Sequence, residues 1–171
     1  MTMPAPVRAF VGVGANLGDA QASVRAALQA LGRLPETRCI ATSSLYRSLP
    51  VEATGPDFIN AVAELHSTLP ALALLRELQV IERAFGRVRS VRNAPRTLDL
   101  DLLLHGEQVL HDDVLTLPHP RLHLRAFVLR PLAELAPTLS LPGLGALEPW
   151  LQRASNQGIE RLAAAPTIAP P

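Results

Sequence analysis

The sequence predicts an α+β fold, a ferredoxin-like β-α-β-β-α-β sandwich with a mostly antiparallel sheet and helices packed on it. Two observations predict this class. The expected elements between residues 7 and 104 follow the order strand, helix, strand, strand, helix, strand, and the remainder is mixed. Two of these segments carry an apolar stripe at helical spacing, and one shows the two-residue alternation of a strand. With 171 residues the chain fits one catalytic domain, which we place at residues 1–160.

The N-terminal part of the chain predicts a strand followed by a helix. Residues 7–13 (VRAFVGV) read as a strand, and the glycine-rich turn GVGANLG contains Gly12, Gly14 and Gly18. These glycines fit either a tight strand-to-helix connection or a contact with phosphate, and the sequence leaves both open. From Asp19, which suits a helix N-terminus, an amphipathic helix runs to Gly32. Its apolar stripe is Val24, Ala27, Leu28 and Leu31.

The middle of the chain predicts two strands joined by a loop. Residues 37–48 are β-branched and polar without a helical stripe, and residues 49–57 contain Pro50, Gly55 and Pro56 as breakers. Residues 58–66 alternate between two faces. One face carries Phe58, Asn60, Val62 and Glu64, and the other carries Ile59, Ala61, Ala63 and Leu65.

The rest of the chain predicts a second helix, a buried strand and a short third helix. The second helix is expected from about residue 70 to residue 85, with Leu74, Leu78, Ile81 and Phe85 as its core stripe. Residues 98–104 predict the strand. Residues 124–135 predict the third helix, although Pro131 opposes its length. Residues 161–171 are rich in Ala and Pro, and we expect them to be disordered.

Composition excludes several classes of protein. The formal net charge of +1 gives no global attraction to nucleic acid or anionic membrane. No apolar run approaches the ~20 residues of a membrane span, and the N-terminus lacks a signal-peptide pattern. Cys39 is the single cysteine, which excludes an internal disulfide and favours a reduced, cytoplasmic location. All sixteen basic residues are arginine, so the lysine-dependent Walker A phosphate loop is excluded.

Two aspartates at the start of the strand predicted over residues 98–104 give the sharpest chemical signal. Side chains two residues apart in a strand share a face, so Asp99 and Asp101 project side by side. Carboxylates held this close repel each other unless a cation lies between them or one binds a proton. Mg²⁺ takes carboxylate oxygens together with substrate phosphates. The alternative is that the acids pair with neighbouring arginines of the segment 87–96.

The residues before this strand are densely basic. Five arginines lie within fourteen residues: Arg83, Arg87, Arg89, Arg92 and Arg96. One guanidinium group can bind two phosphate oxygens at once. Several such groups around a metal stabilise the negative charge during phosphoryl transfer. A solvated basic loop or a nucleic-acid patch is the alternative, but the stretch has no aromatic residue to stack a base. Chemistry alone therefore predicts a Mg²⁺-dependent enzyme acting on a phosphorylated substrate, and it leaves the acceptor open.

Six motifs in order resemble the 6-hydroxymethyl-7,8-dihydropterin pyrophosphokinase family of folate biosynthesis. The resemblance covers about residues 7–137, and its most specific element is Arg92-x-Ala94-Pro95-Arg96-x-x-Asp99-Leu-Asp101-Leu-Leu. The other motifs are Gly14-Ala-Asn16-Leu17-Gly18, Ser43-Ser-x-Tyr46-Arg47-Ser48, Pro56-Asp57-Phe58-x-Asn60, Gln79-x-x-Glu82-x-x-x-Gly86-Arg87-x-Arg89, and Pro118-His119 with Arg125-x-Phe127.

The resemblance implies that the two terminal phosphates of ATP move as a unit to the pterin hydroxymethyl group, releasing AMP. It implies two Mg²⁺ ions on Asp99 and Asp101, with Arg87 and Arg96 as further catalytic residues. By similarity, ATP contacts Gln79, Glu82, Arg89, Arg96, Leu102, Thr116, His119 and Arg125. The pterin pocket is expected at Ser48, Val51, Phe58, Asn60 and Phe127. We expect a monomer that binds no nucleic acid or membrane, and contact with neighbouring folate enzymes stays open.

The sequence departs from the family pattern at a few positions. Family members often carry a tryptophan in the arginine loop, and the nearest residue here is Asn93. Phe58 stands where a tyrosine is common, Pro120 where an aromatic residue can occur, and Leu49 where a proline is often found. None touches the aspartate pair, so we expect altered affinity or loop closure and retained chemistry. Two other functions are kept: another Mg²⁺-dependent phosphoryl or nucleotidyl transferase, and a non-enzymatic RNA-binding domain that uses the arginine loop.

Overall fold

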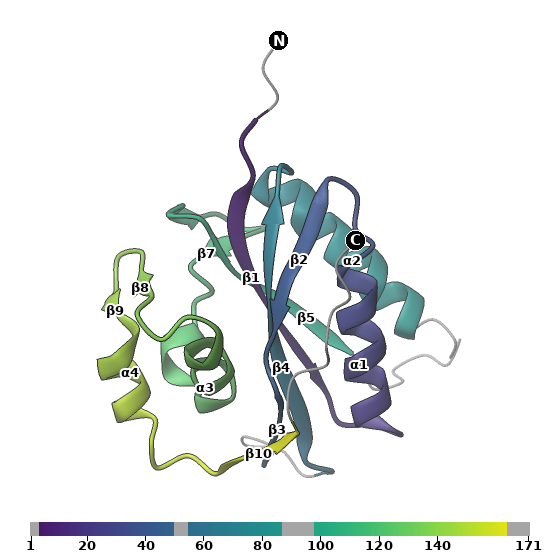
Figure 1. Ribbon diagram of the computed structural model, residues 1–171, viewed down its shortest axis with the longest axis vertical. Coiled ribbons are helices and arrows are strands. Elements are labelled where there is room, and N and C mark those ends of the chain that lie inside the picture. Colours follow the sequence, from purple (N-terminus) through teal and green to yellow (C-terminus); the bar gives the residue numbers. More distant parts are fainter. Residues whose placement is uncertain (1–3, 50–54, 87–97, 164–171) are drawn as a thin grey trace.

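A computed structural model describes residues 4–49, 55–86 and 98–163 of the chain. Its main feature is a six-stranded antiparallel sheet in the order β10-β3-β4-β1-β5, with β2 also paired to β4 (Figure 1). The strands are β1 (Val7–Ala15), β2 (Thr37–Thr42), β3 (Leu45–Ser48), β4 (Phe58–Ser67), β5 (Asp99–His105) and β10 (Ile159–Ala163). This arrangement confirms the predicted ferredoxin-like α+β class.

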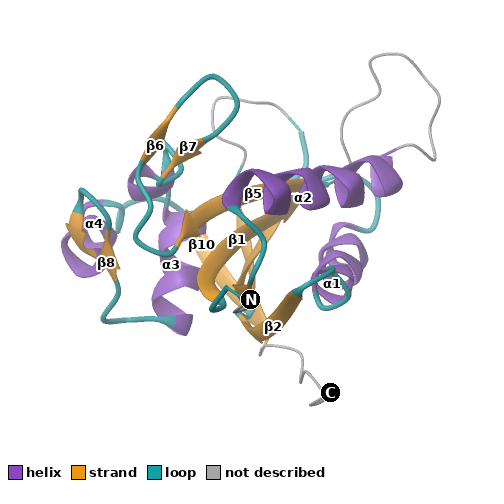
Figure 2. Cartoon of the chain, turned by 90° about the horizontal axis from the view of Figure 1, so that it is seen from above, coloured by secondary structure: helices purple, strands orange, loops and turns teal. Residues whose placement is uncertain are grey.

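Helices cover both faces of this sheet, which therefore has two cores (Figures 1 and 2). Helices α1 (Ala20–Leu31) and α2 (Ala71–Gly86) pack on one face, over a core that includes Val13, Leu65 and Leu102. Helices α3 (Ala126–Leu135) and α4 (Leu147–Arg153) lie on the other face, over a core that includes Phe10 and Val62. No helix in the described ranges is long and apolar enough to cross a membrane.

The first helix forms as the sequence predicts. The Asp19 carboxylate accepts a hydrogen bond from the backbone N–H of Ala22 at 3.1 Å, which satisfies one of the free donors of the first turn. All four residues of the predicted stripe are buried, and Gly32 caps the C-terminus. In α2, Leu74, Leu78 and Ile81 are buried as predicted.

The strand predicted over residues 37–48 is wrong as a single element, because it is broken into β2 and β3 at Ser43 and Ser44. Both halves pair with β4, and a register shift accompanies β2. Between them, Ser43 stays tied to β4: its backbone N–H donates to Val62 O, and its Oγ accepts from Val62 N. A side-chain hydroxyl thus replaces a ladder bond at the break, which propensity alone does not reveal.

The C-terminal third contains several short elements. Two-stranded pairs form between β6 (Leu110–His111) and β7 (Thr116–Leu117), and between β8 (Ser140–Leu141) and β9 (Gly145–Ala146). A 3-10 turn, η1 (Leu122–Leu124), precedes α3, so the predicted helix begins at residue 126 rather than 124. Pro131 lies inside α3 and is buried, so packing against the sheet outweighs its lost backbone donor.

The predicted boundary at residue 160 falls inside β10, which pairs antiparallel with β3. Residues 161–163 therefore belong to the sheet and were wrongly assigned to the tail. The remainder of that tail, residues 164–171, lies outside the described residues.

Candidate active site

The two aspartates lie where the strand alternation predicted. Leu98, just before β5, and Leu100 and Leu102 within it belong to the core under α1 and α2, so Asp99 and Asp101 project from the opposite face. A hydrogen bond from the Leu100 backbone N–H to the Glu82 carboxylate, 2.9 Å long, ties this strand to α2. The edge of the sheet thus holds both carboxylates on a fixed backbone.

Beside the aspartates, β1 presents glycines instead of side chains. Gly12 pairs with Asp101 and Gly14 pairs with Asp99, and across the strand Gly14 also pairs with Asn60. A Cβ at position 14 would lie 3.2 Å from Asn60 Oδ1, so a larger residue would press on that amide. Both glycines lie in β1, which continues past residue 13, so the turn begins later than predicted; of the three glycines in this stretch, Gly18 has the left-handed backbone (φ 59°) of a turn.

A cavity of about 260 Å³ opens over this part of the sheet. It brings together four of the five predicted pterin residues, both aspartates and Arg125. The described residues that line it are Gly12, Val13, Gly14, Ser48, Leu49, Phe58, Asn60, Ala61, Asp99, Asp101, Arg125, Phe127 and Val128. Residues from β1, β3, β4, β5 and α3 therefore meet in one cavity. The motif resemblance had placed several of them in one pocket, although the sequence does not reveal how the strands pair.

Inside the cavity, Asn60 Nδ2 donates a 2.7 Å hydrogen bond to Ser48 Oγ, and both side chains are buried. With its nitrogen on the serine, the amide has its carbonyl oxygen left for another donor. Phe58 pairs with Ser48 across β3 and β4, and its ring also lines the cavity. An apolar ring beside an oriented amide is an arrangement that suits a flat heterocycle with a hydrogen-bonding edge.

Positive charge reaches the cavity from the start of α3. The guanidinium carbon of Arg125 lies 5.3 Å from the centre of the Phe127 ring, a cation–π contact between two cavity residues. Burial lowers the pKa of Arg125, the neighbouring Arg121 lowers it further, and Asp101 opposes both. The guanidinium stays charged at neutral pH and is available to an anionic group near the aspartates.

His119 lies next to the second aspartate, with its Nε2 4.0 Å from Asp101 Oδ1. Its backbone N–H donates to Leu103 O, and its Nδ1 accepts from the Arg121 backbone N–H at 3.2 Å. Because Nδ1 is an acceptor, the proton of the neutral ring lies on Nε2, facing Asp101. Burial lowers the pKa of His119, Asp101 opposes this, and Arg125 and Arg121 lower it further.

Among the residues that the structure describes, the other predicted nucleotide residues do not line the cavity. Gln79 is exposed on α2, and Glu82 supports β5 through the Leu100 N–H. Leu102 is buried in the core on the far face of the sheet, and Thr116 is half-buried in β7. The predicted residues Val51, Arg87, Arg89 and Arg96, and also Asn93, lie outside the described residues.

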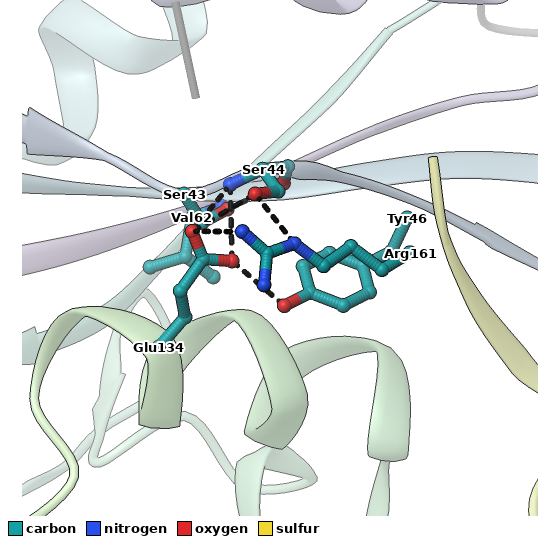
Figure 3. A network of polar contacts seen from close by, with 6 residues as sticks. All are labelled: Ser43, Ser44, Tyr46, Val62, Glu134 and Arg161. Carbon is teal, nitrogen blue, oxygen red and sulfur yellow. Dashed lines mark hydrogen bonds and ion pairs between the residues drawn. The ribbon is translucent and has the colours of Figure 1, made fainter. Parts of the chain in front are cut away.

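A polar network around Glu134 joins β3 to α3, which both contribute residues to the cavity wall (Figure 3). Its carboxylate accepts hydrogen bonds from the Ser44 backbone N–H, the Ser44 hydroxyl and the Tyr46 hydroxyl. From β10, Arg161 donates to Ser44 Oγ at 3.0 Å and lies 3.9 Å from the carboxylate. The network connects the helix that carries Phe127 to the strand that carries Ser48.

Sequence reasoning did not assign two groups of residues to the site, although it kept a phosphate contact by the first group open. Gly12 and Gly14 line the cavity, and their two-residue spacing on one strand face was the available signal. Glu134 was not singled out, since its partners on β3 are about ninety residues away in the sequence. No periodicity links positions so far apart.

An α+β sheet that gathers two carboxylates, a guanidinium and an amide around one cavity suits an enzyme that binds a phosphorylated compound. The chain belongs to the 7,8-dihydro-6-hydroxymethylpterin-pyrophosphokinase (HPPK) family, whose model matches residues 10–137. The 2-amino-4-hydroxy-6-hydroxymethyldihydropteridine pyrophosphokinase of Pseudomonas aeruginosa is 50% identical over 156 residues, covering 91% of this chain and 96% of the relative. The Haemophilus influenzae protein of the same name is 44% identical, covering 80% and 86%. The resemblance inferred from the motifs is therefore confirmed.

The fold also matches solved structures. A crystal structure of wild-type Plasmodium falciparum HPPK-DHPS superimposes with a TM-score of 0.71 at 12% identity, over 86% of this chain. The chain spans about 44% of that longer protein. At this identity the match concerns the fold alone.

Proposed function

We propose that this chain is a pyrophosphokinase that transfers the two terminal phosphates of ATP to 6-hydroxymethyl-7,8-dihydropterin in folate biosynthesis. The hydroxymethyl oxygen attacks the β-phosphorus of ATP. The bond from that phosphorus to the α–β bridging oxygen breaks, AMP leaves with this oxygen, and the hydroxyl proton passes to solvent. The observation that carries the proposal is the single cavity in which the Ser48–Asn60 pair and the two aspartates meet.

The pterin occupies the inner part of this cavity. The Asn60 amide has its nitrogen on Ser48, so its carbonyl oxygen accepts from the amino and ring N–H groups of the pterin edge. Phe58 and Phe127 provide apolar walls for the ring. The family resemblance adds Val51 to this proposed pocket. This places the hydroxymethyl arm toward Asp99 and Asp101, where the transferred phosphates must lie.

The residues at the cavity mouth fit a magnesium-nucleotide complex. Asp99 and Asp101 supply hard oxygen donors from one strand face, and the side chain of Asp101 is 46% exposed. In the described ranges, no cluster of three or more His, Cys, Asp or Glu side chains could hold a metal alone. Because Mg²⁺ is commonly bound by one or two carboxylates together with substrate phosphates, the nucleotide phosphates would complete the coordination. Two bound Mg²⁺ ions would neutralise the phosphates and acidify the attacking hydroxyl.

The cationic residues hold the rest of the nucleotide. Arg125 and His119 flank Asp101 and orient phosphate oxygens by hydrogen bonds. Arg87, Arg89 and Arg96 add guanidinium groups during transfer, and Gln79, Glu82, Leu102 and Thr116 complete the nucleotide site. The enzyme acts as a monomer in the cytoplasm.

A product analysis tests the proposal. The protein is incubated with Mg-ATP and the reduced pterin, and AMP, ADP and the pterin product are separated by chromatography. Equal amounts of AMP and pterin pyrophosphate, with no ADP, are expected. ADP as the product would instead indicate an ordinary kinase, and absence of pterin-dependent AMP would overturn the proposal.

Two variants connect the reaction to the carboxylates. Asp101→Asn should lower kcat at least a hundredfold, roughly the loss reported for key electrostatic groups. Asp113→Asn, which changes an exposed carboxylate outside the cavity, is the matched control and should retain activity. Equal activity of the two variants would contradict the metal assignment.

A further inference from the structure

Gln157 connects the C-terminal segment to the start of α3. It follows α4, and its backbone N–H donates to Ala154 O at 3.1 Å, which fixes the chain at this point. The segment between α4 and β10 passes beside α3 (Figure 1). Gln157 lies twenty residues beyond Pro137, where the match to the family model ends.

The carboxamide of Gln157 makes two hydrogen bonds to the backbone of the η1–α3 junction. Its Oε1 accepts from the Ala126 N–H at 2.9 Å, and its Nε2 donates to Leu124 O at 2.8 Å. These are the backbone groups on either side of Arg125. One side chain from a distant segment therefore fixes the peptide groups before and after a cavity residue.

In the part of the chain that the structure describes, the junction has no other side-chain cap. Arg125 is the N-cap residue of α3, with φ −121° and ψ 115°, and its own side chain makes no capping bond. A free first-turn N–H normally finds a Ser, Thr, Asp or Asn at this position. An arginine side chain has no acceptor and cannot cap this N–H, so Gln157 satisfies the Ala126 donor while the Arg125 side chain lines the cavity.

We propose that Gln157 is a positioning residue for Arg125, setting the backbone that aims the guanidinium at the phosphate end of the cavity. The inference rests on the proposed function, because it assumes that Arg125 binds the nucleotide. An amide is required at this position, since the site needs one donor and one acceptor. A carboxylate in its place would face the Leu124 carbonyl with a second acceptor.

The test compares Gln157→Ala and Gln157→Glu with Gln152→Ala in the full-length protein. Gln152 is an exposed glutamine of α4. Its side chain donates to Glu148 at 3.4 Å, a hydrogen bond within α4 that does not reach the η1–α3 junction. The Kd of Mg-α,β-methylene-ATP, which cannot transfer pyrophosphate, is measured by calorimetry, and kcat and KM are measured with ATP. Both Gln157 variants should weaken analogue binding about tenfold, the size of one or two lost hydrogen bonds.

A double-mutant cycle separates positioning from general stability. In an Arg125→Ala background, Gln157→Ala should change the analogue Kd less than twofold, because the group it positions is gone. The KM for ATP should rise in Gln157→Ala more than kcat falls, whereas Gln152→Ala changes neither. Hydrogen exchange should show faster exchange of the Ala126 amide in Gln157→Ala.

The outcomes distinguish the inference from the function on which it rests. Tenfold effects of equal size in both Arg125 backgrounds, or wild-type binding by Gln157→Ala, would overturn the positioning role alone. A wild-type protein that neither binds the analogue nor forms AMP would overturn the proposed function and this inference together. Coupling between Gln157 and Arg125 in a protein that forms AMP would support both.

Discussion

The Tyr46 hydroxyl donates a 2.7 Å hydrogen bond to Glu134 Oε1, joining β3 to α3 across the sheet–helix boundary (Figure 3). The same carboxylate accepts from the backbone and the hydroxyl of Ser44. The groups that contact Glu134 are all donors, so the side chain at this position must accept hydrogen bonds on both of its terminal atoms. A carboxylate does this. The hydrogen bond from the Ser44 N–H to Glu134 also explains the break between β2 and β3, because this N–H points toward α3 and not toward a neighbouring strand.

Replacing Glu134 by Gln should destabilise the protein. Glutamine places an N–H₂ group against donors from Ser44 or Tyr46, which leaves a partly buried donor without its acceptor. We expect the free energy of unfolding to fall by about 1–3 kcal/mol, measured by urea denaturation. Glu148→Gln on the exposed surface of α4 is the control and should change it by less than about 0.5 kcal/mol. An equal change in both variants would show that the network contributes nothing.

The Tyr46 hydroxyl should ionise at a higher pH than an ordinary phenol. Burial, followed by the hydrogen bond and negative charge of Glu134, raises the pKa of Tyr46 from 10.0 to about 12. Because the raised pKa belongs to the folded state, the stability it contributes is complete below pH 10 and is lost as pH rises through about 12. Tyr46 is the single tyrosine, so absorbance at about 295 nm reports it alone. A folded-state midpoint near 10 would contradict this, and Glu134→Gln should lower the midpoint.

Cys39 should react slowly with alkylating reagents. Burial raises the pKa of its thiol from 9.0 to about 11, with a backbone hydrogen bond at Ala41 opposing the rise and the negative charge of Glu64 adding to it. The thiolate is the reactive species, so its fraction at pH 8 is about a hundredfold lower than for an unshifted thiol. Mass spectrometry should show slow modification by iodoacetamide in the folded protein and rapid modification in urea. Equal rates would mean that the thiol is not protected.

The sequence alone predicted the parts of the fold that local patterns determine. The α1 stripe and its Asp19 cap, the two faces of β4 and the outward aspartates of β5 all follow from periodicity within one element. The parts it missed depend on contacts between distant segments. The strand break needs Glu134, and the last strand forms because β3 offers a free edge to residues 159–163.

The candidate site was predictable to a similar extent. Motif resemblance placed Ser48, Phe58, Asn60 and Phe127 in one pocket, and the cavity brings these four together. The glycines of β1 were assigned to a turn, because their role depends on the register that sets Gly14 opposite both Asn60 and Asp99. The roles of the arginines in residues 87–96 stay predictions.

Gly14→Ala should weaken pterin binding by crowding the amide that recognises the ring. The added Cβ would lie 3.2 Å from Asn60 Oδ1, so the carbonyl must shift away from its bonding position while Nδ2 stays on Ser48. We expect the Kd for the pterin to rise about tenfold, the loss of roughly one hydrogen bond, measured by fluorescence titration. Gly12→Ala adds the same methyl to the same strand, but its nearest neighbour is Leu103 at an ordinary 3.5 Å, so its loss should be smaller. If Gly12→Ala is the more damaging change, crowding of Asn60 is not what makes glycine necessary at position 14.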